Sequence, residues 1–227
     1  MAKDTDLIRL DTILARLTRQ RTAAISYLTF LRDMTDNDSR YVKYKSSYGG
    51  HVLNLAQIGI ENSLILYCNR VWDQNPDAQS IPNSIKIFRG LGIKIAEKRA
   101  AFGEGDLAPG WKERQTVKLN EIISNYESIK MSKVRSVIRI IRTESLAHLL
   151  EESRDRKKDF PLGYENHNIN RNDFYKYSEH TIRLIDLMAY FRSGKVYDYN
   201  ETCSVFQSYC NAFWDNLPIL SEVENSV

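Results

Sequence analysis

Apolar residues recur at three- and four-residue spacing along almost the whole chain. Leu7, Leu10, Leu14 and Leu17 follow this spacing near the N-terminus, and such spacing places side chains on one face of a helix. The pattern predicts helices in seven segments: Asp4–Met34, His51–Trp72, Pro82–Ala101, Trp111–Glu127, Lys130–Glu152, Phe174–Phe191 and Asn200–Trp214. No stretch alternates apolar and polar residues as a half-buried strand does. The predicted fold class is therefore all-α, a single helical bundle of about six to seven helices.

Glycine, proline and asparagine mark the breaks between these helices. Asn75-Pro76-Asp77 has the composition of a turn, and Pro82 stands at a helix start, where proline is tolerated. Three glycines and a proline indicate a loop at Gly103–Gly110. We expect Gly49-Gly50 to break the chain just before the second helix. That helix is apolar on nearly all sides, so we expect it at the centre of the bundle.

The bulk composition is that of an ordinary globular protein. The 227 residues are 42% hydrophobic and 27% charged, which argues against disorder. No linker is long and polar enough to separate a second domain. We expect one domain over residues 1–227, with its core at about 4–192 and a C-terminal helix at about 199–214. The chain lacks an apolar run of membrane-spanning length, an N-terminal signal region and enough cysteines for a disulfide framework. These features predict a cytoplasmic protein without membrane association.

The charge is unevenly distributed along the chain. The net charge is only +3, yet the stretch from residue 130 to residue 143 holds five basic residues and no acid. The five are Lys130, Lys133, Arg135, Arg139 and Arg142. Lys133, Arg135 and Arg139 are candidates to follow an RNA backbone, because basic side chains neutralise phosphates. A solvated helix face is the alternative interpretation of the same run.

The basic run ends in Arg142-Thr-Glu-Ser-Leu-Ala-His148. Arginine carries a permanent charge and a planar donor fork that suits phosphate. Histidine is the side chain whose proton affinity suits acid–base work near neutral pH. Together they would suffice to cleave a phosphodiester without a metal. The structural alternative is that His148 lies on an apolar stripe with Val134 and Ile141, and that Arg142 pairs with Glu144 or with an acid on another helix.

Arg142 and His148 lie about 120° apart around a regular helix, so one straight helix does not bring them together. Two such helices paired about a twofold axis would gather two arginines and two histidines in one cleft. Glu144 lies about one turn before His148, where its carboxylate would orient the imidazole ring. Ser145 is small and would let RNA or a partner backbone approach closely. If Arg142 and His148 are catalytic, this geometry predicts a homodimer, with Glu144 and Ser145 supporting the pair.

The spacing of Arg142 and His148 on a late helix of an all-α chain resembles the HEPN superfamily, named for nucleotide binding in higher eukaryotes and prokaryotes. A second segment, Cys68-Asn-Arg70-Val-Trp72-Asp73 followed by Ile81-Pro82-Asn-Ser-Ile85, resembles the abortive-infection U-type (AbiU-like) branch. Leu146-Ala147-His148 also matches that branch, and the resemblance covers roughly residues 4–192. Two positions depart from many active members. Thr143 stands where an amide or acid is common, and Leu150 stands where several toxin branches carry tyrosine.

This resemblance implies a metal-independent endoribonuclease toxin, without a cofactor, in phage defence or in a toxin–antitoxin pair. It implies RNA as the substrate and, as partner, an antitoxin that is a nucleotidyltransferase or a small protein. Consistent with this, no His, Cys or Asp cluster has zinc-ligand spacing. One alternative is a catalytically silent HEPN module that binds RNA, a nucleotide or a protein, and another is a helical adaptor with a coincidental motif. Arg70 and Asp73 would either form an ion pair that locks the turn or support the site.

Overall fold

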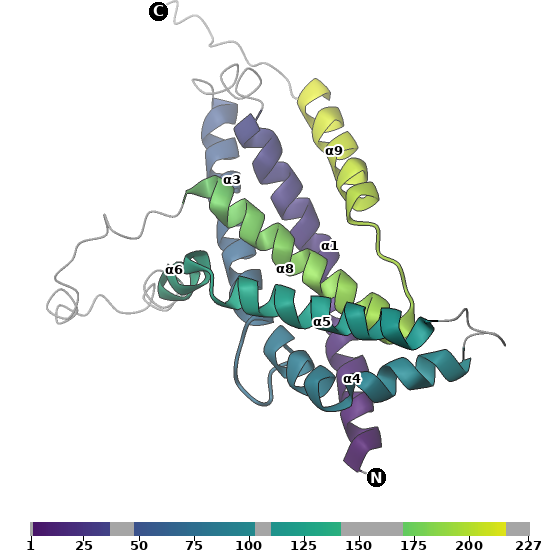
Figure 1. Cartoon of the computed structure of the whole chain (residues 1–227). Coiled ribbons are helices and arrows are strands. Elements are labelled where there is room, and N and C mark those ends of the chain that lie inside the picture. Colours follow the sequence, from purple (N-terminus) through teal and green to yellow (C-terminus); the bar gives the residue numbers. More distant parts are fainter. Residues whose placement is uncertain (1, 37–47, 103–109, 142–169, 217–227) are drawn as a thin grey trace, which may run out of the picture.

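The computed structural model describes residues 2–36, 48–102, 110–141 and 170–216. Seven α-helices account for most of these residues, and no strand occurs among them (Figure 1). The helices are α1 (Ala2–Asp36), α3 (Tyr48–Val71), α4 (Ile81–Phe102), α5 (Trp111–Lys130), α6 (Lys133–Ile141), α8 (Arg171–Ser193) and α9 (Tyr199–Asn216). The prediction of an all-α bundle of six to seven helices is confirmed. None of the seven is long and apolar enough to cross a membrane.

One core of buried apolar side chains receives residues from every one of these helices. Helix α1 packs along α3, α8 and α9, while α4 and α5 pack on each other and on α8 (Figure 1). The rings of Phe88 and Phe191 meet edge to face, with centroids 5.6 Å apart, and join α4 to α8. Helix α8 also contacts α3 and α6. The central helix of the bundle is therefore α8.

The expectation that the second helix is central is wrong. Helix α3 buries Leu64 and Val71 on its inward face, but Val52 and Leu55 on its outward face are 66% and 69% exposed. Its apolar character on all sides reflects a core-facing side and an uncovered apolar side. Helix α3 also runs through Gly49-Gly50 instead of starting after them, because glycine lowers helix propensity without ending a helix that is packed by its neighbours.

The helix predicted to begin at Lys130 begins instead at Lys133. Helix α5 continues to Lys130, and the chain then turns at Met131 and Ser132. The Ser132 hydroxyl accepts a hydrogen bond from the backbone N–H of Val134 at 3.2 Å, which is what an N-cap serine does. This cap lets α6 leave the direction of α5 and pack against α3 and α8 (Figure 1).

Helix α8 begins three residues before its predicted start. The Asn170 side chain accepts a hydrogen bond from the backbone N–H two residues further on, at 2.9 Å, so Asn170 is the N-cap. The helix ends at Ser193 and is capped by Gly194, whose φ of 74° is favourable for glycine and whose N–H donates to the Tyr190 carbonyl. The predicted turn at Asn75 is also present, closed by the Ala78 N–H bonded to the Asn75 carbonyl at 2.9 Å.

Candidate functional site around helix α6

The predicted site residues fall partly inside and partly outside the described part of the chain. Those outside it are Arg142, Thr143, Glu144, Ser145, His148 and Leu150. Lys133, Arg135 and Arg139 lie on α6, and Arg70 and Asp73 lie at the end of α3. The structure therefore describes the approach to the predicted catalytic pair: the basic helix whose last described residue, Ile141, immediately precedes Arg142.

Helix α6 is fixed to α3 by a side-chain amide. Nδ2 of Asn69 on α3 donates to the carbonyl oxygen of Ile138 on α6 at 3.2 Å, and also to the carbonyl of Ile65 on α3 at 3.1 Å. Ile138 itself is only 2% exposed and belongs to the core. The last described turn of α6 is thus held by one buried apolar side chain and one bridging amide.

Arg135 is held in place rather than extended into solvent. Its guanidinium carbon lies 5.1 Å from the centroid of the Trp72 ring, and Nη1 donates to the Lys130 carbonyl at 3.3 Å. The Trp72 ring stacks on Tyr126 at 5.5 Å, and its indole N–H donates to the Thr181 hydroxyl at 3.1 Å. A cation over an indole ring is attracted by the ring quadrupole. Arg135 therefore contributes to packing α6 against the end of α3.

The other two basic residues of α6 are exposed, but they do not share a face. At about 100° per residue, Arg139 lies about 40° from Arg135 and about 120° from Lys133 around the helix. Both Lys133 and Arg139 are exposed to solvent. Arg135 and Arg139 therefore lie on one side of α6, and Lys133 lies at its margin.

Arg70 and Asp73 do not form the ion pair that was one of the two expectations for them. Arg70 is exposed, and no ion pair joins these two described side chains. The Asp73 carboxylate instead accepts the Asn75 backbone N–H at 2.9 Å, a local bond that shapes the turn. Arg70 is left on the surface near the end of α3.

Cys68 in the same segment is not a nucleophile. The thiol is fully buried, and burial raises its pKa to about 12, against the opposing hydrogen bond with Ser178. Because the thiolate is the reactive form, Cys68 remains neutral and inert at physiological pH. Its role is to pack α3 against α8.

The first cation of the basic run is partly neutralised by a neighbour on α5. Nζ of Lys130 lies 3.5 Å from the Glu127 carboxylate, which also accepts a bond from Arg89 of α4. The bond from Arg89 lowers the pKa of Glu127, with Lys130 as a smaller contributor. Part of the charge of Lys130 is therefore balanced by Glu127.

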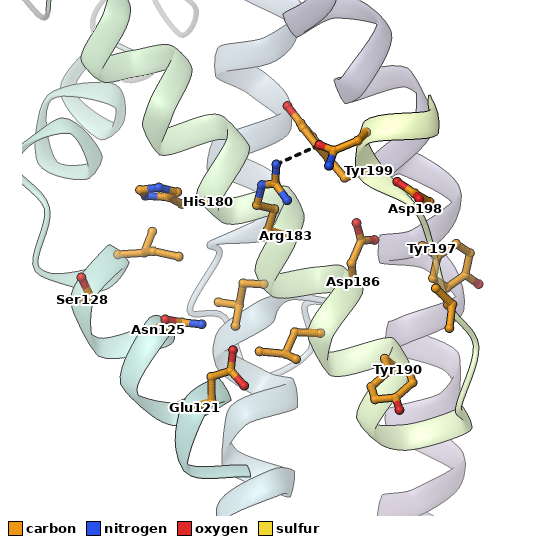
Figure 2. Close-up of a pocket in the computed structure, with 15 residues that line it drawn as sticks. Glu121, Asn125, Ser128, His180, Arg183, Asp186, Tyr190, Tyr197, Asp198 and Tyr199 are labelled. Atoms are coloured by element: carbon orange, nitrogen blue, oxygen red, sulfur yellow. Dashed lines mark hydrogen bonds between the residues drawn. The ribbon is translucent and has the colours of Figure 1, made fainter. Parts of the chain in front are cut away.

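A groove lies beside this region, between α5, α8 and the start of α9 (Figure 2). Its volume is about 630 Å³. A smaller hollow of about 270 Å³ at the start of α6 shares His180 and Ser128 with it. Arg183 in the groove donates to the Asn200 side chain at 3.2 Å. Burial raises the pKa of Asp186 at its floor, against the opposing hydrogen bond from Arg21.

Sequence reasoning missed three residues of this region: Asn69, Trp72 and His180. Asn69 and Trp72 stood inside the segment that carries the AbiU-like resemblance, but nothing in the sequence indicated that they contact α6. His180 had no partner at metal-ligand spacing and gave no signal. Within the described ranges, no group of three or more His, Cys, Asp or Glu side chains is arranged to hold a metal ion.

The segment Cys68–Asp73, which carries part of the resemblance, contacts α6 through Asn69 with Ile138 and through Trp72 with Arg135. A family model described as AbiU2, an HEPN family, matches residues 8–213. The chain therefore belongs to the AbiU2 family of HEPN domains. It has no match among curated proteins or among solved structures.

Proposed function

We propose that this AbiU2-family chain is an endoribonuclease that cleaves RNA without a metal ion, using Arg142 and His148 in a cleft shared by two copies. The observation that supports the proposal most is the docking of α6. Asn69 and Trp72 fix the helix that runs directly into Arg142, and a catalytic residue is effective only when its supporting elements hold it within a fraction of an ångström.

In the proposed reaction, the 2′-oxygen of a ribose attacks the adjacent phosphorus, and the bond from phosphorus to the 5′-oxygen of the next nucleotide breaks. One His148 would accept the 2′-hydroxyl proton, and the protonated His148 of the other copy would donate a proton to the leaving 5′-oxygen. Such proton transfer contributes about 10²- to 10⁴-fold in rate. Arg142 would bind the phosphate and stabilise the charge that grows on its oxygens. Glu144 would orient the imidazole, and Ser145 would leave room for RNA.

The described basic residues suggest a path for the RNA strand. Arg139 and Arg70 are exposed near the docked end of α6, where their charges would contact phosphates on either side of the scissile bond. Lys133 lies further away and would add a weaker contact. Arg135 would contribute indirectly, because its contact with Trp72 fixes the angle at which α6 leaves α3.

The proposal is tested by incubating single-stranded RNA with purified protein in EDTA. Wild-type protein should cleave it and His148→Ala should not, while His51→Ala, which removes an exposed histidine outside the motif, should cleave at the wild-type rate. RNA binding should survive His148→Ala and weaken in Arg142→Ala, which loses a phosphate contact as well as transition-state stabilisation. Equal cleavage by wild type and His148→Ala would identify the activity as a contaminant.

A catalytically silent module that binds RNA, a nucleotide or a protein is the second candidate. Thr143 and Leu150 favour it, because they depart from the pattern of many active HEPN toxins. Under this alternative, RNA would bind with a salt-dependent affinity but remain intact. An antitoxin, either a nucleotidyltransferase or a small protein, is expected as partner only under the toxin proposal.

A further inference from the structure

Helix α3 has an uncovered apolar stripe opposite the side that faces the core. Val52, Leu55 and Leu66 are 66%, 69% and 38% exposed. We call these three residues, together with the exposed Gly59 and Asn62, the α3 seam. Chain steps of three and four residues separate its five members, which is the spacing of a two-helix coiled-coil interface. Isolated exposed aliphatic residues are common in proteins, but here three of them share one face of a single helix.

The α3 seam carries no charge. Between His51 and Leu66 the only acidic or basic side chain is Glu61, and it is turned toward α8, where its carboxylate lies 3.2 Å from Arg171. A partner selected by opposite charge would have nothing to recognise on this surface. A second copy of the same seam matches it, because a twofold contact pairs each residue with a residue of the same set.

Gly59 lies at the middle of the seam and leaves room for close approach. A methyl group added to its Cα would meet no atom within 4 Å. Helices approach most closely where a glycine replaces a side chain at their contact. The glycine therefore suits a helix–helix contact better than an exposed surface, where it only weakens the helix.

We propose that the α3 seam pairs in parallel with the α3 seam of a second copy, about a twofold axis that runs along the two helices. In parallel register, Asn62 meets Asn62 of the other copy, and each amide can donate to the other. An antiparallel pair centred on Gly59 would place Asn62 against Leu55, leaving an amide without a partner, which is costly. This inference rests on the proposed function in one respect: it identifies how two copies would form the shared cleft.

The parallel arrangement would bring the two α6 helices to the same end of the pair. Asn69, which binds α6, follows Leu66 by three residues, so α6 docks beside the C-terminal end of the seam. An antiparallel pair would instead separate the two α6 helices by roughly 30 Å, the length of about twenty helical residues. Only the parallel pair is compatible with one cleft that receives a motif from each copy.

The seam alone is too small for a stable dimer. It is about 21 Å long and one helix wide, so its footprint is on the order of 200 Å², against about 800 Å² per partner in a standard interface. The contact would therefore extend beyond the C-terminal end, where Arg70 is exposed in each copy. Because these like charges would repel across the axis, association should tighten as salt rises from about 0.01 M to 0.15 M.

Sedimentation equilibrium of the full chain tests the pairing. Wild-type protein should have twice the 26.4 kDa mass of one chain. Leu55→Glu should weaken association by about a hundredfold or more, because both copies lose an apolar contact. Val117→Glu changes a side chain that is also 66% exposed, on α5, and should leave the mass unchanged. Circular dichroism would verify that each variant is folded. A monomeric wild type, or a dimer indifferent to Leu55→Glu, would overturn the proposal.

Disulfide trapping tests the orientation. Leu66→Cys should form a disulfide with itself across the axis only in the parallel pair, since bridged cysteines need Cα atoms within about 7 Å; Val117→Cys is the control. A dimer that Leu66→Cys does not trap would refute the parallel arrangement. RNA cleavage is scored separately. A trapped dimer that leaves RNA intact would refute the ribonuclease proposal but not the pairing. Full cleavage by monomeric Leu55→Glu would refute the role of the seam in forming the cleft but not the ribonuclease proposal.

Discussion

Replacing Asn69 should loosen the docking of α6 on α3 without unfolding the bundle. The side chain makes one hydrogen bond between the two helices, at 3.2 Å to the Ile138 carbonyl, and such a bond contributes about 0.5–1.5 kcal/mol net. The nine described residues of α6 are too few to form a stable helix alone. We therefore expect Asn69→Ala to lower the free energy of opening α6 by about 1 kcal/mol, roughly a fivefold change in the opening equilibrium.

Hydrogen exchange measured by mass spectrometry would detect this change peptide by peptide. Amides of α6 should exchange about fivefold faster in Asn69→Ala, while those of α1 and α8 should keep the wild-type rate. Asn69→Asp should be worse than Asn69→Ala, because a carboxylate oxygen would face the Ile138 carbonyl where a donor is needed. Asn54→Asp, on an exposed position of the same helix, controls for the added charge. Wild-type exchange of α6 in Asn69→Asp would refute the inference that this amide holds the helix.

Two further predictions concern the bundle that carries the site. Arg21 and Asp186 form a nearly buried ion pair, so Arg21→Met should destabilise the fold by about 3–5 kcal/mol in urea unfolding at pH 7. Burial raises the pKa of Asp186, so the ionised carboxylate is the disfavoured form. The loss of unfolding free energy in Arg21→Met should therefore shrink as the pH falls and the carboxyl gains a proton. A loss that grows in acid would contradict this. Gly90→Ala should raise thermal stability by up to about 1 kcal/mol, since its added methyl group meets nothing within 4 Å. Gly92→Ala should gain less or lose stability, because its Cβ would lie 2.5 Å from Cδ2 of Leu119; equal gains would refute the packing argument.

The sequence was sufficient for the helices but not for their arrangement. Three- and four-residue spacing located the seven helices of the described residues, because core-facing side chains must repeat once per turn. It placed the break between α5 and α6 three residues too early, since Lys130, Met131 and Ser132 fit the start of the next helix as well as the end of α5 until the Ser132 cap is seen. It also placed α3 at the centre, because an apolar surface that faces the core and one that is left exposed have the same composition.

The candidate site was predictable only in outline. The basic run and the Arg142–His148 spacing are local features, so they can be read from neighbouring residues. The contact between Trp72 and Arg135 joins residues far apart in the chain, and no local pattern encodes it. Asn69 was visible as part of a family motif, but its hydrogen bond to α6 depends on how two helices cross. The exposure of the α3 seam likewise becomes evident only when the core is assembled.

The ends left on cleaved RNA test the central claim most directly. Wild-type protein in EDTA, incubated with an unstructured RNA, should leave 2′,3′-cyclic phosphate and free 5′-hydroxyl ends, detectable by mass spectrometry of the fragments. The same sequence made as DNA lacks the attacking hydroxyl and should stay intact, and His148→Ala should leave the RNA intact as well. Intact RNA with the wild-type protein, cleavage of the DNA, or fragments that carry 5′-phosphates would each contradict attack by the 2′-hydroxyl at an Arg142–His148 site.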